Sequence, residues 1–129
     1  MSTGKVLFSF DEKTSLVELS FSAPGENAME HDAMAEELKQ IYEDLISRYK
    51  DTQFKVFVDL TNAGLPTKHA TEVYVKTLSD KRILKTAFFG ISKSIESVIN
   101  FIIESAGRGG ETRFFINKEE ALAWLLATT

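Results

Sequence analysis

The chain has 129 residues, of which 43% are hydrophobic and 26% charged, with a formal net charge of −4 and no cysteine. This length predicts one domain, residues 1–129, with its own core. The absence of cysteine excludes disulfides, thiolate metal sites and a cysteine nucleophile, and the acidic balance argues against a nucleic-acid partner. Because the chain starts without a signal-peptide pattern and has no run of about 18 apolar residues, we expect a cytoplasmic protein without a transmembrane segment.

The first part of the chain predicts a β-hairpin followed by a long helix. Residues 5–10 and 16–21 alternate between apolar and polar side chains around a polar loop, as in a hairpin near a sheet edge. Asn27 and Glu30 have the spacing of a capping box, and apolar residues then recur at three- and four-residue steps as far as Tyr49. This periodicity predicts an amphipathic helix with a solvated acidic face.

The rest of the chain predicts strands that alternate with helices. Residues 54–60 are almost continuously apolar, as in a strand buried on both faces, and a helix follows from Pro66 to about residue 79. Residues 83–90 predict another central strand, and residues 113–116 a short one; helices follow both. The order β-β-α-β-α-β-α-β-α predicts an α/β fold, with a mixed, mostly parallel five-stranded sheet, an opening hairpin and four helices on its faces.

No catalytic or metal-binding motif is present in the sequence. His31 and His69 lack a third metal ligand at a suitable spacing and are better explained as surface residues. The phosphate-binding glycine fingerprints and the nucleophile elbow are also absent. Asp59, at the end of the central strand, has a position used in catalysis by some α/β folds, although capping of the following turn explains it more simply. We expect no enzyme activity, no catalytic residue, no cofactor and no metal.

Polar side chains follow both central strands. Because the carboxyl ends of parallel strands share one edge, these side chains predict a polar, cationic rim that holds an anion or a peptide backbone, or else remains empty. The predicted rim consists of Asp59, Thr61, Asn62, Thr67, Lys68, Ser92, Lys93 and Ser94.

The third predicted helix, from Ser92 or Ser94 to about Ala106, has an unusually wide apolar face. Phe101 and Ile103 extend the stripe that one sheet would cover. Either the helix is enclosed within the domain, or these residues and Ile91 form an exposed patch for dimerisation or lipid contact. The second alternative predicts a homodimer about a two-fold axis.

Two segments resemble a known family. The strand and turn at residues 56–64 resemble the corresponding corner of STAS domains, and residues 86–90 are also similar. Residues 113–125 have an aromatic strand, an acidic cap and then Glu-Ala-x-x-Trp-Leu. This ending resembles the SpoIIAA-like branch of the STAS and CRAL-TRIO-like group. The resemblance implies a non-enzymatic regulatory module that binds a protein partner, such as a kinase-like regulator.

The resemblance also implies a phosphorylated serine in the turn after the central strand. At that position this chain has Asn62, which carries no hydroxyl, so Thr61 and Thr67 are the possible phosphoacceptors. The lipid-carrying relatives imply an alternative, a small carrier or sensor of an apolar or lipid-like ligand beneath the third helix. An enzyme that uses Asp59 and a lysine ranks last. A tightly packed interior with a flat polar rim would favour the interaction module, and a bound apolar ligand would favour the carrier.

Overall fold

The computed structural model describes residues 3–127, which form a five-stranded sheet and four helices in the predicted order. The strands are β1 (Val6–Asp11), β2 (Leu16–Phe21), β3 (Phe54–Asp59), β4 (Ile83–Phe89) and β5 (Thr112–Phe115). The helices are α1 (Ala28–Arg48), α2 (Lys68–Leu78), α3 (Lys93–Ser105) and α4 (Lys118–Leu126), with a short 3-10 turn, η1 (Gly109–Glu111), before β5. Within the described residues, no helix is long and apolar enough to cross a membrane.

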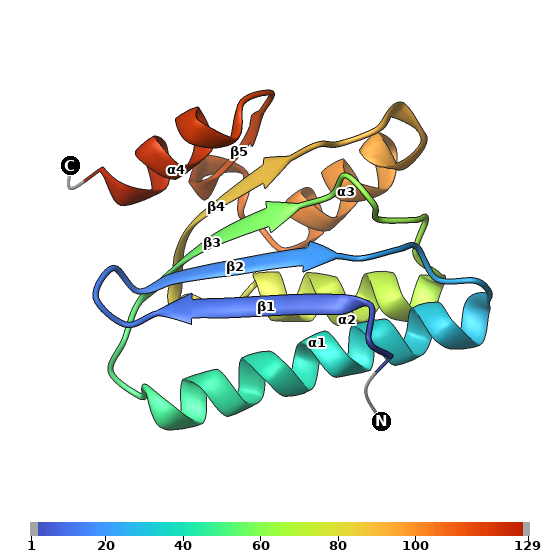
Figure 1. The fold of residues 1–129 in the computed structure, drawn as a ribbon, viewed down its shortest axis with the longest axis horizontal. Helices are drawn as coiled ribbons and strands as arrows, with labels where there is room; N and C mark the ends of the chain where they lie inside the picture. Colours follow the sequence, from blue (N-terminus) through green and yellow to red (C-terminus); the bar gives the residue numbers. More distant parts are fainter. Residues whose placement is uncertain (1–2, 128–129) are drawn as a thin grey trace.

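The sheet has the sequential strand order β1-β2-β3-β4-β5 (Figure 1). β1 pairs with β2 in the antiparallel sense, and every later pairing is parallel, so the predicted hairpin does lie at an edge. β3 is the central strand. Its Phe54 and Phe57 are 0% and 1% exposed and belong to core clusters on opposite faces, which confirms the prediction of burial on both sides.

The helices are divided unequally between the two faces of the sheet. Each step from β2 to β5 moves to the next strand in the same direction, and right-handed crossovers then place α1, α2 and α3 on one face. On that face Leu45 of α1 packs with Val56, and Ile99 of α3 packs with Phe88. Only α4, through Leu125, covers the other face (Figure 1). The larger core therefore lies between the sheet and three helices.

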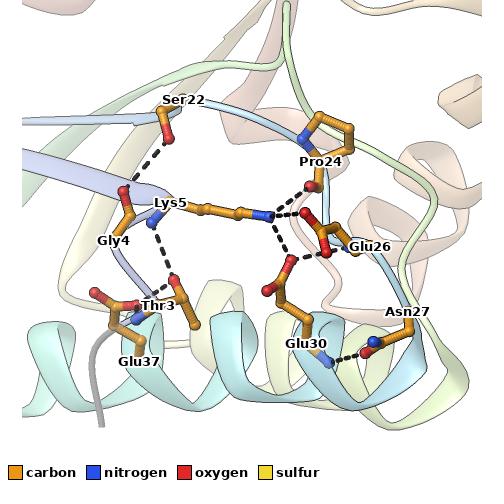
Figure 2. A network of polar contacts seen from close by, with 9 residues as sticks. All are labelled: Thr3, Gly4, Lys5, Ser22, Pro24, Glu26, Asn27, Glu30 and Glu37. Atoms are coloured by element: carbon orange, nitrogen blue, oxygen red, sulfur yellow. Dashed lines mark hydrogen bonds and ion pairs between the residues drawn. The ribbon is translucent and has the colours of Figure 1, made fainter.

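A network of polar contacts joins the start of β1 to the start of α1 (Figure 2). Asn27 caps α1 by accepting a hydrogen bond from the Glu30 backbone at 2.9 Å, as predicted. The Glu30 carboxylate accepts one from the backbone of Glu26, one residue before the expected capping-box partner. Lys5 donates to the same carboxylate at 2.5 Å, and this hydrogen bond is the main cause that lowers the pKa of Glu30.

The start of α2 differs from the prediction by two residues. The helix begins at Lys68 rather than at Pro66. Thr67 is the N-cap, and its hydroxyl accepts a hydrogen bond from the Ala70 backbone at 3.0 Å. A side-chain cap at Thr67 satisfies one of the free amides that begin a helix, which a proline one residue earlier cannot do.

Candidate functional site

The predicted rim begins at the turn after β3. The Asp59 carboxylate accepts hydrogen bonds from the Thr61 backbone at 2.9 Å and from the Thr61 hydroxyl at 2.6 Å. These two bonds form an Asx-type turn, which confirms that Asp59 caps the turn.

The turns that follow β3 and β4 are in direct contact. The Leu60 backbone donates to the Phe89 carbonyl at 2.7 Å, and Gly90, with a φ of +76°, packs against Thr61. A side chain at Gly90 would collide with Thr61, so glycine permits this close approach. The structure thus brings the Thr61 turn beside the start of α3. The rim residues with exposed side chains are Thr61, Asn62, Lys68, Ser92, Lys93 and Ser94.

Thr67 differs from the other members of the rim. Its side chain is half-buried, caps α2 and donates a hydrogen bond to the Asp32 carboxylate of α1. A phosphate on this hydroxyl would disrupt the contact that joins the start of α2 to α1. Thr67 therefore has a structural role at the contact between α1 and α2, and Thr61 is the more accessible of the two hydroxyls.

The predicted apolar patch on α3 is largely wrong. Ile103 is only 6% exposed, and Ile91 is half-buried against the cluster that contains Leu60 and Phe88. The face of α3 is wide because α3 packs against α2 as well as against the sheet. Of the three predicted patch residues, Phe101 alone is exposed, at 58%.

The interior contains a cavity of about 130 Å³ between the sheet and helices α1, α2 and α3. Strands β1 to β4 form one wall, and the three helices form the others. Of the 25 lining residues, five carry a polar side-chain atom: His31, Tyr42, Tyr74, Thr77 and Thr86. No lysine, arginine, aspartate or glutamate is among these 25 residues. The cavity is thus almost entirely apolar and lies in the larger of the two cores.

One end of the cavity lies where α1 begins, close to the turn after β3. His31 lines this end and packs between two glycines, because a β-carbon on Gly25 would lie 2.7 Å from the imidazole and one on Gly64 would lie 3.2 Å from it. The prediction of a surface histidine was therefore wrong for His31, which is half-buried, whereas His69 is exposed. Phe8 on the edge strand also lines the cavity and is 36% exposed, so the cavity approaches the surface near β1.

The tyrosines of the cavity are neutral phenols. Burial raises the pKa of Tyr74 to about 12. Burial is also the main cause that raises the pKa of Tyr42, and the nearby Asp80 carboxylate adds to it. The low polarity of the surroundings disfavours the phenolate in both cases. The cavity therefore offers hydrogen-bonding groups without negative charge.

Sequence reasoning gave an apolar ligand beneath the third helix only as an alternative, and it did not locate a cavity bounded by three helices. The apolar stripes of α1, α2 and α3 predict burial, but they do not reveal whether the buried side chains fill the space between the elements. Among residues 3–127, no group of three histidine, cysteine, aspartate or glutamate side chains could hold a metal ion.

Comparison with solved structures gives the fold a name. The chain is similar to an uncharacterized protein from the DUF3478 family, with a SpoIIAA-like fold, from Shewanella loihica PV-4. The identity is 18% and the TM-score 0.67, over 97% of this chain and 98% of that one. The expectation of a SpoIIAA-like fold is thus confirmed. No curated protein matches this chain significantly.

A family model covers most of the chain. It is described as a domain of unknown function, DUF7793, and matches residues 28–129, from the start of α1 onward. The matched part includes every helix, three of the five strands and the turns of the rim. On this match, the chain belongs to the DUF7793 family.

Proposed function

We propose that this protein is a non-enzymatic module that binds a small apolar ligand in the cavity between the sheet and α1–α3. The observation that carries the proposal is the cavity itself, with its volume of about 130 Å³ and its almost entirely apolar lining. A void of this kind is destabilising when empty, by roughly 24 cal/mol for each Å³. An apolar cavity of about 150 Å³ admits a molecule of the size of benzene.

The ligand proposal is favoured over a purely structural interior by the position of the cavity. It extends from Phe8 at the edge strand to Ile99 in α3, beneath most of the sheet. Binding sites in proteins are typically concave and apolar with a few polar groups, as here. We also propose that the module is not an enzyme, because Asp59 is engaged by its own turn and no hydroxyl of the cavity lining is hydrogen-bonded to His31 as a base.

Titration of the ¹⁵N-labelled protein with toluene, followed by NMR, tests this function. We expect saturable shifts at amides around Val56, Val58 and Tyr74. Val58→Phe should fill the cavity and abolish them. Val98→Phe is the matched control, because Val98 is partly buried on α3 but does not line the cavity. Toluene shifts that survive in Val58→Phe and vanish in Val98→Phe would contradict the proposal.

A second candidate function is protein interaction at the rim, as in the STAS domains that the sequence resembles. The supporting observation is that two separate turns, held together by the contact of Gly90 with Thr61, expose hydroxyls and lysines at one end of the sheet. A kinase-like regulator is the partner class that the resemblance implies, and Thr61 is the phosphoacceptor that we propose in place of the serine replaced by Asn62.

Capture of partners from native cell extract tests the rim. Lys68→Glu combined with Lys93→Glu should release any partner that binds there. Lys50→Glu, an exposed lysine outside the rim, should leave it bound. Mass spectrometry of the native protein should find phosphate on Thr61 and none on Thr67. A partner retained by the double variant would refute recognition at the rim.

A further inference from the structure

Thr86 is the most deeply buried of the polar residues that line the cavity. Thr86, in the central part of β4, is 2% exposed and is the only polar residue among the fully buried side chains of residues 3–127. Its hydroxyl has no hydrogen-bond partner within that part of the chain, although it lines the cavity. Buried hydroxyls are nearly always paired, and an unpaired one is costly. A valine of the same shape would avoid this cost.

The strand register shows why Thr86 faces the cavity. Thr86 pairs with Val56 of β3 and with Thr112 of β5, and residues paired in this way point to the same side of the sheet. Val56 belongs to the core beneath α1, which is on the cavity side. The Thr112 hydroxyl is satisfied, because it donates to the Arg108 carbonyl at 2.7 Å. The Thr86 hydroxyl has no equivalent bond.

The other polar groups of the cavity limit what a ligand can carry. The Thr77 hydroxyl already donates to the Val73 carbonyl at 3.0 Å. Tyr42 has the Asp80 carboxylate nearby, whereas Tyr74 has no hydrogen-bond partner among the described residues. Because the lining includes neither acidic side chains nor lysine or arginine, a charged ligand would be desolvated without compensation.

We propose that the cavity selects a small, neutral, mostly apolar molecule with one oxygen that hydrogen-bonds to the Thr86 hydroxyl. Simple phenols, alcohols and ketones about the size of a benzene ring belong to this class. The proposal rests on the proposed function, and it names Thr86 as the residue that orients the ligand in a largely apolar cavity. A threonine hydroxyl both donates and accepts, so it suits an alcohol and a carbonyl equally.

Phenol and toluene form a suitable pair of probes, because they differ by a hydroxyl in place of a methyl group. Calorimetric titration of the wild-type protein gives the ratio of the toluene to the phenol dissociation constant. In Thr86→Val this ratio should fall about three- to tenfold, the effect of one net hydrogen bond. Thr86→Ser keeps the hydroxyl and should retain most of the preference.

Thr77→Val is the matched control, since it is the same substitution in the same cavity at a hydroxyl that is already paired. It should leave the ratio unchanged. If both probes bind the wild-type protein and Thr86→Val leaves the ratio unaltered, the orienting role of Thr86 is refuted while the cavity remains a binding site. If neither probe binds the wild-type protein, the proposed function itself fails.

Discussion

Gly90 provides the sharpest test of the contact between the two turns of the rim. Its φ of +76° is unfavourable for any residue with a β-carbon, and Gly90→Ala should lose about 1–2 kcal/mol from this strain. The new β-carbon would also lie against the Thr61 hydroxyl and 3.0 Å from the Thr61 backbone nitrogen. Relieving that overlap should remove about 1–3 kcal/mol more. We therefore expect a loss of about 2–5 kcal/mol in the free energy of unfolding.

Gly107→Ala separates the two contributions. Gly107 has a similar φ of +69°, but a β-carbon there would meet no atom within 4 Å. Its loss should be the backbone strain alone, about 1–2 kcal/mol. The entropic gain from alanine in the unfolded chain is common to both variants and cancels in the difference. Urea denaturation followed by circular dichroism should show Gly90→Ala to be less stable by about 1–3 kcal/mol, and equal losses would refute the close approach to Thr61.

Three further predictions follow from the core, from Tyr74 and from α3. Leu125→Ala, at a fully buried position, should lower the free energy of unfolding by about 2–5 kcal/mol in a denaturation experiment. Trp124→Ala should lower it by less, because the Trp124 side chain is only half-buried. A larger loss for Trp124→Ala than for Leu125→Ala would contradict the packing of α4. Burial raises the pKa of Tyr74 from its ordinary 10.0 to about 12 in the folded protein, so folding favours the neutral phenol. The free energy of unfolding should therefore be unaffected by Tyr74 below pH 10 and should fall by about 2–3 kcal/mol as the pH rises to about 12. Tyr74→Phe should lack this fall, and identical alkaline stability profiles for the two proteins would refute it. Phe101→Asp should leave the melting temperature almost unchanged, because Phe101 is exposed. If α3 forms the predicted homodimer, light scattering should show the unmodified protein as a dimer and the Phe101→Asp variant as a monomer. A single-chain mass for the unmodified protein would exclude that dimer.

Local patterns in the sequence predicted most of the fold. The alternation at residues 5–10 and 16–21 marked the edge hairpin, and the continuous run at 54–60 marked the central strand. The cap at Asn27 was also predicted, because it depends on a side chain and a backbone amide three residues apart. Such features are predictable because they involve only near neighbours in the chain.

The features that the sequence did not predict depend on contacts between distant elements. Ile103 extends the apolar stripe of α3, and the sequence could not show that α2 helps to cover it. His31 is polar and lies in the first turn of a helix, yet two glycines from different loops enclose it. The cavity depends on how the side chains of three helices meet the sheet, which no single periodicity reports.

The position of the rim was easier to predict than the cavity, because it does not depend on how side chains from distant elements pack. The carboxyl ends of parallel strands meet at one edge whatever the side chains are, so Thr61 and Ser92 could be placed at the same edge from the expected strand direction alone. The structure added the contact of Gly90 with Thr61 and removed Thr67 from the accessible hydroxyls. Neither the contact of Gly90 with Thr61 nor the capping role of Thr67 could be predicted from the residue types in the turns.

The most direct test of the central claim is a crystal structure of the protein under xenon pressure. Xenon occupies apolar cavities of this size and requires no hydrogen bond. The claim predicts a xenon peak between β3, β4 and helices α1–α3, in contact with residues such as Val58 and Ile99. An interior without xenon, with peaks only at the surface, would contradict a cavity that admits a ligand.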